Sequence, residues 1–134
     1  MSFLPVYIDS SALLKLVLSE PERPALERVL QRFPDRLSSV LLSIECRRIV
    51  LRAECPPEVI GRLEEELGAV TLIRLEGPVQ KLAASIGPPR LRSLDAIHLA
   101  SALSIGDYPE AFVTYDERLA EAAHAAGLNV LTPL

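Results

Sequence analysis

Short apolar runs alternate along this chain with longer stretches in which apolar residues recur every three or four positions. The first pattern predicts buried strands, and the second predicts helices with one apolar face. Strands are expected at residues 4–8, 35–39, 69–75, 111–114 and 128–134, and helices at 11–19, 24–33, 38–55, 57–67, 78–86, 93–106 and 116–127. Strands and helices therefore take turns through the whole chain.

This alternation defines the expected fold class. Strands that are joined by helical crossovers pair in parallel, and their helices cover both faces of the sheet. We therefore predict a single α/β domain over residues 1–134. Ser38 or Ser39 is expected to cap the helix at 38–55, and Ser93 the helix at 93–106, because serine oxygens accept bonds from the free N–H groups of a first turn.

Composition and charge narrow the class of protein. Apolar residues make up 49% of the 134 residues, as in globular domains, and no run approaches the roughly 20 apolar residues of a membrane span. The N-terminal stretch has no Lys or Arg before its apolar run, which makes a poor signal peptide. Cys46 and Cys55 are the only cysteines and predict a reduced, cytoplasmic protein without zinc. The net charge of −4 argues against a general nucleic-acid binder, although arginines gather locally.

Two aspartates directly follow predicted strands. Asp9 ends the run Val6–Ile8, and Asp116 comes after "AFVTY". Ligands bind beyond the carboxyl ends of the strands in open parallel sheets, so both side chains reach the same rim if the two strands are neighbours. Taken alone, Asp9 is better explained as the N-cap of the helix that follows it.

Two further acids lie within predicted helices. Asp95 is in a first turn, where it could simply interact with the helix dipole, but its neighbours are apolar. Glu45 lies in mid-helix on the face of Leu42 and Ile49, although a carboxylate is rarely buried without a partner. Glu45 either pairs with Arg48 on the helix surface or faces a cleft that holds other acids and a cation.

Four converging carboxylates need a counter-charge. At about 4 Å and an intermediate dielectric, each pair repels by several kcal/mol. A divalent cation is the simplest solution, and oxygen ligands without Cys or His select Mg²⁺ or Mn²⁺. Such an ion supports phosphoryl transfer, because it lowers the pKa of bound water and neutralises phosphodiester oxygens.

Four stretches of the chain resemble the acidic motifs of PIN-domain ribonucleases, in particular VapC-type toxins of bacterial toxin–antitoxin pairs. They are "VYIDSSALLKL", "LSSVLLSIECRR", "LRSLDAIHLASAL" and "FVTYDERLAEAAHAAGLNV", and they extend over nearly the whole chain. The resemblance implies a three-layer α/β/α sandwich with a central parallel sheet. It also implies a metal-dependent endoribonuclease that acts as a toxin, with an RNA substrate, a cognate antitoxin partner and a homodimeric state.

The resemblance assigns the active site to four acids, namely Asp9, Glu45, Asp95 and Asp116. Asp9 and Asp95 would be the main ligands of Mg²⁺ or Mn²⁺, and Asp116 would support the metal directly or through water. Glu45 would orient the attacking water or take its proton. All four acids are thus expected at one metal site.

Other residues are expected to shape the site. Ser10 and Thr114 match hydroxyl residues that line it in the family, and Tyr115 stands where many relatives have a small or polar residue. The chain lacks a basic tail, so RNA contacts would come from local arginines. Arg90 and Arg92 in "PPRLR" are the first candidates, and solvated loop charges are the alternative.

Other protein classes on a similar plan fit less well. Haloacid-type phosphatases need a second Asp where this chain has Ser11, and receiver domains need a Lys near the last strand, but no Lys follows Lys81. A PIN-like module that binds RNA or protein without cutting is the alternative function. His98, one turn after Asp95, could reach the site, although a packed or hydrogen-bonded histidine is the favoured interpretation.

Overall fold

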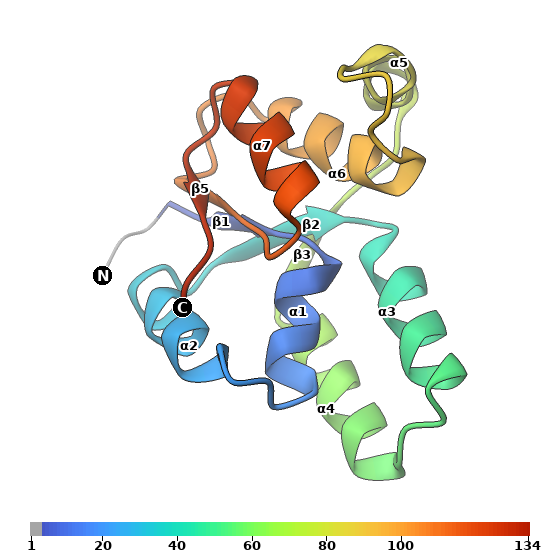
Figure 1. The fold of residues 1–134 in the computed structure, drawn as a ribbon, viewed down its shortest axis with the longest axis vertical. Helices are drawn as coiled ribbons and strands as arrows, with labels where there is room; N and C mark the ends of the chain where they lie inside the picture. The colour runs from blue at the N-terminus through green and yellow to red at the C-terminus, as the bar shows by residue number, and fades with distance from the viewer. Residues whose placement is uncertain (1–3) are drawn as a thin grey trace.

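The computed structural model describes residues 4–134, which form five strands and seven helices (Figure 1). The strands are β1 (Val6–Ile8), β2 (Arg36–Ser39), β3 (Val70–Ile73), β4 (Ala111–Val113) and β5 (Val130–Leu131). The helices are α1 (Ser10–Val17), α2 (Arg23–Arg32), α3 (Leu42–Arg52), α4 (Pro57–Gly68), α5 (Gly77–Ser85), α6 (Ser93–Leu103) and α7 (Glu117–Ala125). None of these helices is long and apolar enough to cross a bilayer.

The strands form one parallel sheet in the order β3-β2-β1-β4-β5. β1 lies at its centre, and its register with β4 pairs Val6 with Ala111 and Ile8 with Val113. The chain therefore leaves β1 and β4 side by side at the carboxyl edge of the sheet. Asp9 and Asp116 were expected to reach the same rim only if these two strands are neighbours, and the sheet meets this condition.

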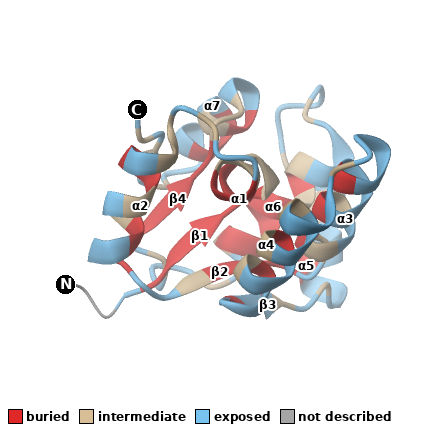
Figure 2. Ribbon diagram, turned by 90° about the horizontal axis from the view of Figure 1, so that it is seen from below, coloured by how far each residue is buried: buried red, intermediate tan, exposed pale blue. Residues whose placement is uncertain are grey.

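Helices cover both faces of the sheet, which gives three layers (Figures 1 and 2). Val6 and Ile8 of β1 point to one face and pack against buried side chains of α1, α2, α3 and α4. Tyr7 points to the opposite face with Phe112 of β4, and both pack against α6 and α7. The alternation follows from the two-residue period of a strand. The predicted α/β/α sandwich with a parallel sheet is confirmed.

The predicted serine caps were wrong at two helices. Ser38 and Ser39 belong to β2, are fully buried and pair with β3, so α3 begins only at Leu42. Burial in the centre of a sheet overrode their preference for a helix end. At α6 the N-cap is Arg92, which makes no capping hydrogen bond through its side chain, and Ser93 is the first helical residue. The hydroxyl of Ser93 therefore comes one residue too late to cap.

Candidate active site

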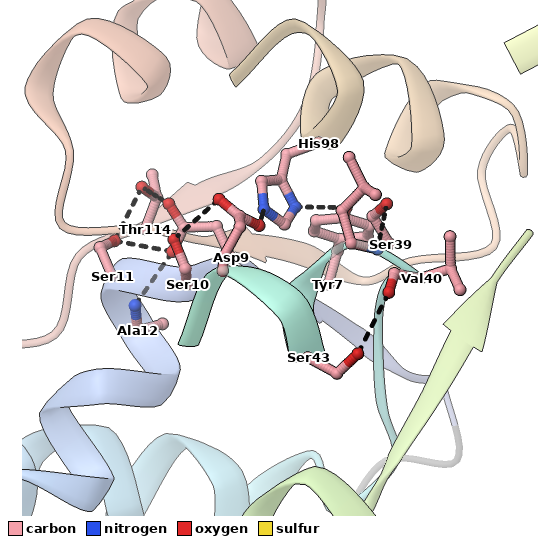
Figure 3. Close-up of polar contacts among 12 residues, drawn as sticks. Tyr7, Asp9, Ser10, Ser11, Ala12, Ser39, Val40, Ser43, His98 and Thr114 are labelled. Carbon is pink, nitrogen blue, oxygen red and sulfur yellow. Dashed lines mark hydrogen bonds and ion pairs between the residues drawn. The ribbon is translucent and has the colours of Figure 1, made fainter. Parts of the chain in front are cut away.

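Asp9 is held rigidly at the carboxyl end of β1 (Figure 3). Its Oδ1 accepts the N–H of Ala12 at 3.0 Å and the hydroxyl of Ser11 at 2.7 Å, and its Oδ2 accepts the hydroxyl of Thr114 at 2.6 Å. Burial raises the pKa of this carboxyl, against the opposing effects of His98 and of these hydrogen bonds. Asp9 is thus the N-cap of α1, as its position suggested, and also a buried carboxylate at the sheet edge.

Hydroxyl groups tie the segment after β1 to the segment after β4. Thr114 Oγ1, which donates to Asp9, accepts the N–H of Asp116 at 3.1 Å. Ser11 Oγ accepts the N–H of Tyr115 at 2.9 Å. Asp116 is the N-cap of α7, and its side chain accepts the N–H three residues on at 2.9 Å. The two aspartates are therefore fixed at the same edge of the sheet.

Glu45, on the first turn of α3, is held by a histidine from α6. Its Oε1 lies 2.7 Å from Nε2 of His98, and its Oε2 accepts the hydroxyl of Ser10 at 3.4 Å. The other ring nitrogen of His98 lies 2.7 Å from the hydroxyl of Tyr7, and the imidazole is buried. Glu45 thus pairs with His98 instead of Arg48. His98 is packed and hydrogen-bonded as predicted, and it also contacts the site.

Asp95 lies on the first turn of α6, and the charges of the other three acids affect its pKa. Its pKa is raised, first by partial burial and then by the negative charges of Asp116, Asp9 and Glu45, while His98 acts in the opposite direction. Coulombic effects of this kind require the groups to be near one another. The four acids, from β1, α3, α6 and α7, therefore meet in one region of the molecule.

The donor set suits a hard divalent cation, although the acids are not arranged as a ready-made metal cluster. Across residues 4–134, no group of three or more His, Cys, Asp and Glu side chains is placed to hold an ion. The oxygens of Asp9 and Glu45 contact protein donors instead. Carboxylate oxygens are nevertheless the ligands that Mg²⁺ and Mn²⁺ prefer, and the mutual repulsion calls for positive charge. The residues fit such an ion in chemistry and in charge.

The other predicted residues border this region. Ser10 contacts Glu45, and Thr114 contacts Asp9. Arg90 and Arg92 are exposed in the segment between α5 and α6, and with Asp95 they line a cleft of about 680 Å³. The hydroxyl residues thus contact the acids, while the arginines lie beside them.

The site contacts of four residues near the acids were not predicted from the sequence. Tyr7 is one position from a core-facing residue in β1, and strand alternation alone could have placed it toward α6. Ser11 was considered only as a missing Asp, yet its hydroxyl binds Asp9. The contact of His98 with Glu45 joins two helices that are far apart in sequence, and no local sequence pattern predicts it. Arg118 lies within the last of the four motifs but was not singled out there, and the packing of α7 brings it to the cleft of Asp95.

Comparisons with known proteins cover this whole region. The sequence model of the PIN domain family matches residues 6–125, which include all four acids. Ribonuclease VapC46 of Mycobacterium tuberculosis is 39% identical over 128 residues, which cover 96% of this chain and 97% of the relative. Ribonuclease VapC47 of the same species is 40% identical over 132 residues, 96% of each chain.

A solved structure has the same fold. The crystal structure of Mycobacterium tuberculosis VapC20, described as a sarcin-ricin loop cleaving toxin, superposes with a TM-score of 0.72. The match covers 96% of this chain and 99% of that chain, at 15% sequence identity. At this identity the likeness concerns the fold alone.

Proposed function

This chain belongs to the PIN domain family, and from that membership we propose that it is a metal-dependent endoribonuclease that acts as a VapC-type toxin. The observation that carries the proposal is that Asp9, Glu45, Asp95 and Asp116 lie around the carboxyl edge of the sheet. Thr114 links Asp9 to Asp116, Ser10 contacts Glu45, and the negative charges of the other three acids raise the pKa of Asp95. The ribonuclease relatives cover nearly the full chain. RNA is therefore the substrate we propose.

Three aspartates would hold the cation. Asp9 and Asp95 would be the main ligands of Mg²⁺ or Mn²⁺, and Asp116 would support it directly or through water. When bound, the ion supplies a Lewis acid that neutralises charge on the scissile phosphate and makes water a better nucleophile. The N–H and hydroxyl donors to Asp9 and Asp116 hold these carboxylates in place before any ligand arrives.

Glu45 would act on the attacking water. Its Oε1 is engaged by His98, so the carboxylate has a fixed orientation. Its Oε2 has only the long contact to Ser10, at 3.4 Å, and is the oxygen left to accept a proton. His98 is then a positioning residue, because it acts on the substrate only through Glu45.

A PIN-like module that binds RNA or protein without cutting is the second candidate. The protein hydrogen bonds that already engage the oxygens of Asp9 and Glu45 favour it. The presence of all four acids in one region favours the nuclease instead. The two candidates differ in whether the purified chain breaks phosphodiester bonds.

Partners and location are also proposed. We infer a homodimer and a cognate antitoxin, which are supported by exposed apolar side chains on α3, where Ile44 is 59% and Leu51 64% exposed. Both cysteines, Cys46 and Cys55, are free thiols, in keeping with a cytoplasmic protein.

The purified chain is expected to cut RNA only when a divalent cation is present. Cellular RNA is incubated with the chain and Mg²⁺ or Mn²⁺, and the new ends are sequenced. Chelation with EDTA should abolish cleavage at the mapped sites, and added Mg²⁺ or Mn²⁺ should restore it, because the acids need a counter-charge before they admit a phosphodiester. Cleavage that persists in EDTA would rule out the metal, and intact RNA under all conditions would favour the silent module.

A further inference from the structure

A cleft lies beside the acids, at Asp95. It has a volume of about 680 Å³ and lies between α7 and the segment that leads into α6. Pockets of roughly 300–1,000 Å³ bury ligands of drug size, which is also the size of a nucleotide. Asp95 belongs to its lining, so one part of the cleft adjoins the acidic site. A ligand in the cleft would therefore sit next to the reacting phosphate.

Part of the cleft wall is apolar and formed by small side chains. Ala122, Ala125 and Ala126 follow one another at helical spacing and present one face of α7 to the cleft, with Leu91 also in the lining. Short side chains leave the surface open to a flat group. A nucleic-acid base offers such a flat, largely apolar face.

Arginines supply positive charge around this wall. Arg90 and Arg92 come from the segment before α6, and Arg118 comes from the first turn of α7. Within residues 4–134, none of these three guanidinium groups has an ion pair or a hydrogen bond, whereas those of Arg36 and Arg47 are paired with glutamates. The acids of the lining are Asp95 and Glu121. Three unpaired guanidinium groups beside an apolar wall match the phosphates and the base of a single strand.

We propose that this cleft binds one nucleotide of the RNA strand next to the scissile phosphate, with its base against the alanine face of α7 and its phosphate held by Arg118 together with Arg92. The proposal rests on the proposed ribonuclease function and extends it to a defined subsite. An unpaired base fits an open wall of this kind, because its face is free to stack on a side-chain surface. Arg118 thereby becomes a proposed RNA-binding residue in addition to Arg90 and Arg92.

The test compares Arg118→Gln with Arg28→Gln in cleavage of a labelled RNA oligonucleotide that spans a mapped cut site. Arg28 is exposed on α2, on the opposite face of the sheet, and its side chain has no ion pair or hydrogen bond to any of residues 4–134, so the control removes the same charge elsewhere. Arg118→Gln should raise KM about 5- to 10-fold with little change in kcat, since the lost contact is the same in ground and transition states. The logarithmic salt dependence of kcat/KM should also become shallower by about 0.7, as expected for one phosphate contact on a single strand.

A second variant tests the apolar wall. Ala125→Leu narrows the cleft and should also raise KM, whereas Ala53→Leu, at the exposed end of α3, should not. Equal KM values for Arg118→Gln and Arg28→Gln, or a loss confined to kcat, would overturn the subsite while leaving the ribonuclease function standing. A parent chain that cuts no RNA would overturn the ribonuclease function, and the subsite with it.

Discussion

Replacing Asp95 with Asn is expected to reduce the rate of RNA cleavage about 1000-fold, which corresponds to about 4 kcal/mol of lost transition-state stabilisation. The negative charges of the other three acids all raise the pKa of Asp95, so its carboxylate lies where a bound cation would offset the most repulsion. The amide of Asn has a similar shape but carries no charge for a cation. The rate is measured on a mapped oligonucleotide at saturating Mg²⁺.

The same variant should fold as well as the parent. Because the folded chain raises the pKa of Asp95, the folded state binds that proton more tightly than the unfolded state, and stability falls as the pH rises above the usual carboxyl pKa. At neutral pH the charge therefore destabilises the metal-free protein, and Asn removes that cost. Without metal, Asp95→Asn should melt no lower than the parent at pH 7.

A charge-matched control separates the site from general electrostatics. Asp107 is exposed in the segment between α6 and β4, and Asp107→Asn should cleave at the parent rate. If Asp95→Asn folds and also cleaves at the parent rate, then Asp95 has no part in the site.

Replacing His98 with Ala is expected to have the second largest effect, because the buried Tyr7 and the partly buried Glu45 lose their contact at once. The hydroxyl of Tyr7 and one oxygen of Glu45 would be left without the imidazole between them. Each unsatisfied buried polar group costs about 1–3 kcal/mol, so the free energy of unfolding should fall by about 2–5 kcal/mol. This fall is measured by chemical denaturation, with His124→Ala, on the exposed face of α7, as the control.

The role of His98 in orienting Glu45 is read from kinetics. His98→Gln keeps a side-chain donor, so it should restore much of the stability and part of kcat. In both variants kcat should fall while KM stays near the parent value, because the RNA-binding arginines are untouched. A His98→Ala protein that is as stable as the parent and cleaves as fast would show that His98 does not position Glu45.

The fold was predictable because the local patterns agreed with it. The run Val6–Ile8 and the stretch before Asp116 have the pattern of buried strands, and the alternation of strands with helices favours a parallel sheet. The serine caps failed where the long-range pairing of β2 with β3 decided the outcome. A helix boundary that is set by tertiary contacts cannot be predicted from the residues at the boundary alone.

The acids were predictable individually, while their partners were not. Asp9 and Asp116 follow strands, and this position alone places them at the carboxyl edge. The Tyr7–His98–Glu45 contacts join β1, α6 and α3, whose residues lie up to 91 positions apart. Such contacts depend on how helices pack, and no single segment carries that information.

The central claim is that these carboxylates share a divalent cation, and it is tested most directly by titrating Mn²⁺ into the metal-free parent chain and following the unbound ion by electron paramagnetic resonance. We predict that Mn²⁺ binds saturably to the parent and to Asp107→Asn, and that its affinity is at least about 10-fold weaker in Asp95→Asn. Equal binding in all three proteins, or none to the parent, would contradict it.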